Sequence, residues 1–208
     1  NFFEEIQIYL DQQINFHIIG TKFKDDQTWK SSGSFSEFDH KIKLKKRENS
    51  NHDSLEVVDW VVGCAMLINL EKFETRNLFD ENIFLYFEEF DLCRQVLSKG
   101  GKIYASKKLY VKHLGHKGSA ATDPDYSIET EMFRNWHWMW SSFYYYKKHY
   151  GYFFALNKTY KKLITSVIKF LFFTFTFNII KKKIYLMRFL GLYNSIIGKK
   201  SWYKAKIK

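Results

Sequence analysis

The stretch IFLYFEEFDLC, residues 83–93, contains three carboxylates directly after an apolar run. Glu88, Glu89 and Asp91 fall in the first turn of a helix predicted for residues 88–99. Acidic side chains in a first turn gain roughly 0.3–1 kcal/mol each from the helix macrodipole, so helix chemistry alone can explain them. The preceding apolar run instead predicts a partly buried edge, where neighbouring carboxylates are costly unless cations or reacting groups meet them.

The segments around this stretch predict a mixed α/β domain. Residues 57–68, VVDWVVGCAMLI, are apolar on both faces apart from Asp59, as expected of a central buried strand. The other expected elements are a helix at 1–13, a strand at 14–24, a long surface loop at 31–54, a short helix at 71–76 and a strand at 102–111. His113 follows that last strand. Only one helix and one strand separate it from the carboxylates, and this connection can bring the histidine back beside them. A lone histidine at a strand end is more often structural.

The C-terminal part of the chain is basic and aromatic. The net charge is +11, and residues 147–208 contain no Asp or Glu. A basic surface of this kind is typical of proteins that bind nucleic acid or anionic lipid. Residues 163–180 are long enough to suggest a membrane span, but Lys169 at their middle costs roughly 2.5–3.5 kcal/mol in lipid. An amphipathic helix that lies in the membrane plane is therefore favoured. The alternative is that this segment packs against the rest of the protein. The apolar blocks and the lack of a nucleic-acid-binding motif argue against nucleic acid.

The two cysteines, Cys64 and Cys93, lie in apolar contexts without paired spacing. This arrangement favours buried thiols in a reducing compartment over a disulfide framework.

Three segments together resemble the C-terminal half of family-2 glycosyltransferases of the GT-A fold. They are VDWVVGCAMLI at 58–68, FDE at 79–81 with FLYFEEFDLC at 84–93, and VKH at 111–113 with GSA at 118–120. Within that family they are most similar to the rhamnosyltransferase-like and galactofuranosyltransferase-like members that build bacterial surface polysaccharides. The resemblance implies an α/β fold, a partial GT-A (nucleotide-diphospho-sugar transferase) sheet with C-terminal helices.

The resemblance also implies a reaction and its residues. An inverting enzyme would move a hexosyl or deoxyhexosyl group from a nucleotide-diphosphate sugar to a glycan or lipid-linked acceptor. Glu89 matches the general base that takes the proton of the acceptor hydroxyl. Asp59, Trp60, Glu88 and Asp91 match positions that bind the acceptor. A divalent metal, Mg²⁺ or Mn²⁺, would neutralise the leaving diphosphate, with His113 as one ligand.

The expected organisation has two parts. Residues 1–125 would form the acceptor-side half of the catalytic domain, and residues 126–208 a helical, basic, aromatic tail that associates with a membrane. The nucleotide-binding half is expected to precede Asn1, so the isolated chain is expected to be inactive. The resemblance suggests a peripheral protein on the cytoplasmic face of the membrane. A non-catalytic membrane-surface scaffold that retains a transferase fold remains the alternative.

Overall fold

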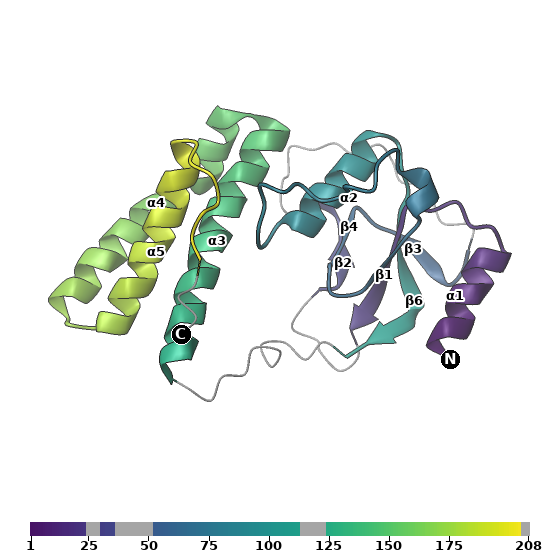
Figure 1. Ribbon diagram of the computed structural model, residues 1–208, viewed down its shortest axis with the longest axis horizontal. Coiled ribbons are helices and arrows are strands. Elements are labelled where there is room, and N and C mark those ends of the chain that lie inside the picture. The colour runs from purple at the N-terminus through teal and green to yellow at the C-terminus, as the bar shows by residue number, and fades with distance from the viewer. Residues whose placement is uncertain (24–29, 36–51, 113–123, 205–208) are drawn as a thin grey trace. The chain divides into compact units, whose positions relative to one another are not determined.

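The computed structural model describes residues 1–23, 30–35, 52–112 and 124–204, the side chains of 124–127 excepted. The chain divides into two compact units (Figure 1). The first, here called the sheet unit, comprises Asn1–Asp80 and Glu89–Gly118. The second, the helical unit, comprises Glu81–Glu88 and Ser119–Lys208.

The sheet unit is built on a mixed four-stranded sheet of order β3-β6-β1-β5. Strand β1 (Ile18–Phe23) pairs in parallel with β6 (Ile103–Val111) and antiparallel with β5 (Met66–Ile68), while β3 (Leu55–Val57) pairs antiparallel with β6. Strands β2 (Ser32–Gly33) and β4 (Trp60–Val61) form a separate antiparallel pair. The sheet unit is therefore of the mixed α/β class that the sequence predicts.

Two helices and one short turn of helix complete the sheet unit. Helix α1 (Phe2–Asp11) packs along β6 (Figure 1). The Tyr9 hydroxyl lies 2.8 Å from Ser106 Oγ. A 3₁₀ helix, η2 (Leu70–Lys72), stands where a helix at 71–76 is predicted. Helix α2 (Glu88–Ser98) agrees with its predicted range to within one residue. The apolar core beneath α1 consists of Tyr9, Ile14, Phe16, Ile19, Leu55, Tyr104 and Leu109.

The single central strand predicted around residues 57–68 does not form. The chain instead makes β4 and β5, which belong to different sheets, with a turn at residues 62–65 between them. Asp59 lies on one side of the break, where its carboxylate accepts hydrogen bonds from Ser34 and from the backbone N–H of Phe35 and so ties this part of the chain to the segment of β2. Gly63 lies within the turn on the other side, and glycine is a common residue at such breaks.

The helical unit contains α3 (Pro124–Tyr150), α4 (Tyr152–Phe175) and α5 (Ile179–Ile196). Its core includes Met139, Phe143, Ala155 and Leu192. Within the described ranges, no helix is both long enough and apolar enough to cross a membrane. The stretch at 163–180 is interrupted where α4 ends at Phe175 and α5 begins at Ile179.

The segment before α2 packs on α3 inside the helical unit. Ser141 Oγ donates to the Leu85 carbonyl at 2.8 Å, and the Tyr86 and Phe87 rings each lie 5.3 Å from the Trp138 ring. Tyr86 and Phe87 have φ angles of 65° and 71°, a left-handed conformation that is uncommon for residues other than glycine. The acidic residues thus occur where the chain passes from the helical unit into the sheet unit.

Candidate functional site

Glu89 stands in the first turn of α2 and lies against the turn between β4 and β5. A Cβ atom added at Gly63 would be 3.4 Å from Glu89 Cβ and 3.9 Å from Glu89 Cδ. Partial desolvation of the thiol raises the pKa of Cys64, although the residue as a whole is exposed, and the charge of Glu89 raises it further. The Glu89 side chain is itself half-buried. The structure therefore places this carboxylate beside Gly63 and Cys64, within the segment that the sequence predicts to adjoin an acceptor.

An aromatic cluster fixes α2 against β4. The Phe90 ring lies 5.0 Å from the ring of Trp60 and 6.4 Å from that of Phe35, and the Arg94 guanidinium lies 4.6 Å from the centre of the Phe35 ring. Trp60 is only 3% exposed. Its ring leaves no room for a side chain at Gly33, because a Cβ atom there would be 2.7 Å from the indole. Trp60 thus holds the residue next to Glu89, and its predicted contact with an acceptor stays a prediction.

Asp59 and Asp91 are buried carboxylates with partners in the protein. Asp59 is 4% exposed, and its Oδ2 accepts from Ser34 Oγ at 2.7 Å and from the Phe35 N–H at 2.8 Å. Asp91 is fully buried and accepts from Gln95 Nε2 at 2.7 Å. These bonds offset the cost of burying charge and indicate that both carboxylates stabilise the local fold. A role of either residue in binding an acceptor remains untested.

Glu88 differs from its neighbours in its environment. Burial raises the pKa of its carboxyl above the ordinary value, and Oε2 is buried without a hydrogen-bond partner among the described residues. A carboxylate with a raised pKa accepts a proton more readily near neutral pH. Glu88 belongs to the helical unit and Glu89 to the sheet unit, although the two residues are consecutive in α2.

The two free cysteines occupy contrasting environments close to Glu89. Cys93 is buried, and burial raises the pKa of its thiol to about 12, with smaller contributions from Glu89 and Asp59. Cys64 is exposed. The prediction that both thiols are buried is therefore wrong for Cys64, because the expected continuous strand is replaced there by a surface turn.

The predicted metal ligand His113 lies outside the described residues. Its predicted approach to Glu89 is consequently neither confirmed nor contradicted. The part of the chain that the structure describes contains no group of three or more His, Cys, Asp or Glu side chains that could hold a metal ion. The Mg²⁺ or Mn²⁺ that the resemblance implies therefore finds no site among these residues and stays a prediction.

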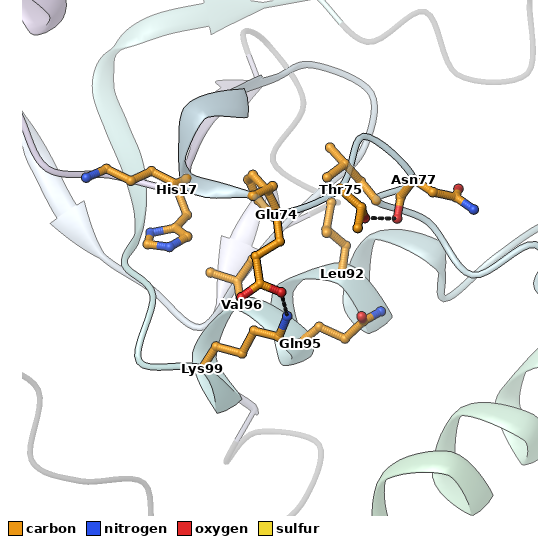
Figure 2. A pocket seen from close by; sticks show the side chains of 11 residues that line it. His17, Glu74, Thr75, Asn77, Leu92, Gln95, Val96 and Lys99 are labelled. Atoms are coloured by element: carbon orange, nitrogen blue, oxygen red, sulfur yellow. Dashed lines mark hydrogen bonds and ion pairs between the residues drawn. The ribbon is translucent and has the colours of Figure 1, made fainter.

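A cavity of about 280 Å³ lies along the C-terminal half of α2 and contains none of the predicted site residues. Figure 2 shows His17, Glu74 and Lys99 around it, with Lys99 Nζ 3.9 Å from a Glu74 oxygen. The Lys102 N–H donates to His17 Nδ1 at 3.2 Å. Burial, and then the charge of Lys72, lower the pKa of His17, so its ring is neutral at physiological pH. No motif in the sequence indicates this cavity, because its lining comes from three separate segments.

Comparison with known proteins gives one partial similarity. No family model matches the chain, and no solved structure matches it. A segment of 60 residues is 33% identical to "Rhamnosyltransferase WbbL" of Escherichia coli (strain K12). The aligned segment covers 29% of this chain and 23% of that protein, so the chain spans about a quarter of the relative that it matches. Over that segment the chain is similar to a glycosyltransferase.

Proposed function

We propose that this chain supplies the acceptor side of an inverting glycosyltransferase of surface polysaccharide synthesis. The substrates would be a nucleoside-diphosphate hexose or deoxyhexose and a glycan or lipid-linked acceptor. The observation that carries the proposal is the position of Glu89, half-buried at the start of α2 and packed against Gly63. The partial similarity to a rhamnosyltransferase supports the same reaction class and makes a rhamnosyl donor the first to test.

In this proposal Glu89 acts as the general base. Its carboxylate takes the proton of the acceptor hydroxyl while the hydroxyl oxygen bonds to the anomeric carbon. The bond from that carbon to the diphosphate oxygen breaks at the same time, and its electron pair leaves with the diphosphate. Attack from the face opposite the leaving group inverts the configuration. The aromatic cluster of Trp60, Phe35 and Phe90 positions the base, because it fixes the first turn of α2.

Glu88 has a separate part in the proposal. A partly buried carboxyl with a raised pKa can bind a sugar hydroxyl as donor or acceptor, which suits a group that orients the acceptor. This division of roles predicts different kinetics for the two glutamates. Loss of Glu89 should lower kcat, whereas loss of Glu88 should mainly raise the KM for the acceptor.

The test compares glutamine variants in the protein expressed from its complete reading frame. Transfer is measured with nucleoside-diphosphate rhamnose and a panel of nucleoside-diphosphate hexoses, using lipid-linked acceptors. Glu89→Gln should reduce kcat by roughly 10²–10⁴-fold with donor affinity retained. Glu56→Gln, an exposed position on β3, is the matched control and should leave kcat unchanged. Unchanged turnover in Glu89→Gln would remove this residue from the role. Lack of transfer by the wild type with every donor would favour the scaffold alternative.

The predicted metal ligand has its own test in the same protein. His113→Ala should raise the Mg²⁺ or Mn²⁺ concentration needed for half-maximal transfer, because one ligand to the ion is lost. An identical titration curve for the variant and the wild type would exclude His113 as a ligand. His52→Ala, outside the proposed site, is the matched control.

A further inference from the structure

We propose that the outer face of α4, together with the turn between α4 and α5, lies on the surface of an anionic lipid bilayer. The inference rests on the helical unit alone and does not require transferase activity. It gives the membrane association expected from the sequence a defined surface.

An apolar stripe runs along α4 on the side that faces solvent. Its members recur at intervals of three and four residues, with Leu171 and Phe172 as neighbours that both follow Ile168 at this spacing, so they share one face of the helix. The members used here, called the α4 stripe, are Tyr160, Ile164, Ile168, Leu171, Phe172 and Phe175, and all are exposed. A continuous exposed apolar surface of this kind marks an interaction site on a soluble domain.

The turn between α4 and α5 continues the α4 stripe. Phe177 is 87% exposed, and Ile179 and Ile180 at the start of α5 are also exposed. Figure 1 shows α4 and α5 side by side and joined by this turn. Large apolar side chains at the end of a helical hairpin are costly in water, and a bilayer interface would bury them.

Lysines beside the stripe point to an anionic partner. Lys181, Lys182 and Lys183 follow the turn directly, and residues 132–208 contain no Asp or Glu. Two of the three are held against aromatic rings: Lys181 Nζ lies 5.3 Å from the Phe173 ring and Lys182 Nζ 5.8 Å from the Phe170 ring. Anionic lipid complements this charge. A second copy of the chain would bring the same positive charge to the contact, so self-association is disfavoured.

Three polar residues of α4, Ser166, Lys169 and Thr174, have hydrogen-bond partners within the helical unit. Lys169 Nζ donates to the Tyr185 hydroxyl at 3.1 Å and lies 5.1 Å from that ring, so α5 holds the cation. Ser166 Oγ and Thr174 Oγ each donate to the carbonyl four residues earlier, at 2.7 and 2.8 Å. Hydroxyls bonded in this way are compatible with an apolar environment. Lys169 therefore argues against a helix that crosses the membrane, but it is compatible with a helix that lies in the membrane plane.

The experiment measures partition of the whole chain onto vesicles by co-sedimentation. The vesicles are phosphatidylcholine alone or phosphatidylcholine mixed with phosphatidylglycerol. The double variant Ile168→Ser/Phe175→Ser should bind mixed vesicles roughly 10- to 100-fold more weakly, because two exposed members of the α4 stripe are lost. Phe3→Ser on α1 is the matched control, since Phe3 is 75% exposed and Phe175 79%, and it should bind as the wild type does.

A second variant tests the charge. Changing Lys181, Lys182 and Lys183 to Gln should weaken binding to mixed vesicles by about fivefold per lysine and leave binding to neutral vesicles unchanged. All substituted positions except Lys182 are exposed, and an unchanged circular dichroism spectrum verifies folding.

Three results would overturn the inference. They are equal binding by the double variant and the wild type, equal losses in the double variant and in Phe3→Ser, or binding to single-stranded RNA without binding to vesicles. Vesicle binding without sugar transfer would count only against the proposed function, so the two proposals fail separately.

Discussion

Gly191 in α5 gives a quantitative test of how closely the helical unit packs. A Cβ atom at this position would be 2.2 Å from the carbonyl oxygen of Trp136 and about 3 Å from its carbonyl carbon and Cα. These are backbone atoms of α3, so no side-chain rotation can relieve the clash. Ordinary contact requires about 1 Å more separation between α3 and α5.

The expected cost of Gly191→Ala follows from two opposing effects. Overpacking of a close interface costs about 1–3 kcal/mol, and a clash with backbone belongs at the upper end. Alanine in place of glycine within a helix returns about 1 kcal/mol. The variant should therefore lose about 2 kcal/mol of unfolding free energy. Helix propensity alone predicts the opposite sign.

Urea unfolding of the full chain, followed by tryptophan fluorescence, measures this difference. Four of the six tryptophans, Trp136, Trp138, Trp140 and Trp202, belong to the helical unit, so most of the signal comes from that unit. Asn157→Ala at an exposed position of α4 is the control and should be neutral or slightly stabilising. A Gly191→Ala variant as stable as the wild type, or more stable, would refute the close approach of α5 to α3.

Three further variants test individual contacts. Asp59→Ala should lower the free energy of unfolding, measured in urea, by about 3 kcal/mol. Two hydrogen bonds to the carboxylate are lost, and the buried N–H of Phe35 loses its acceptor. A loss below about 1 kcal/mol would contradict this expectation. Glu88→Gln should gain stability relative to the wild type as the pH rises above 4.5, because the raised pKa of Glu88 means that its ionisation weakens the folded state; a difference independent of pH would exclude this effect. Burial lowers the pKa of His137, so stability should fall as the pH drops below about 6.5, and His137→Gln should reduce that slope in thermal melts; equal slopes would show that His137 is not the titrating group.

Local patterns in the sequence predict some of the regular elements closely, although β2 lies within the predicted loop at 31–54. Helix α2 is indicated by its acidic first turn and by the glycines at 100 and 101, and both signals act within the element itself. Strand β6 is predicted to within one residue by its apolar run. Helix α3 begins at Pro124, two residues before the expected start of the helical tail at residue 126.

The structural features that the sequence does not predict depend on contacts between distant parts of the chain. The break at Asp59 is not predicted, because the donors to its carboxylate, Ser34 and Phe35, lie 25 and 24 residues earlier. The apolar run at 83–87 is predicted to place the three carboxylates at a buried edge, and Asp91 is buried while Glu88 and Glu89 are half-buried. The packing of the Tyr86 and Phe87 rings on Trp138, about fifty residues later, is not predicted. The cavity beside His17 likewise needs three segments to meet. Periodicity carries no information about such pairings.

The two thiols have different environments, and this difference allows selective chemical labelling close to Glu89. Cys93 is buried and its thiol has a pKa of about 12, so it stays protonated and shielded from alkylating reagents. Cys64 is exposed, and its raised pKa slows alkylation at neutral pH without preventing it. A maleimide fluorophore should therefore label the wild-type chain at one position, without mutagenesis. The dye would report on any molecule that binds beside the neighbouring carboxylate.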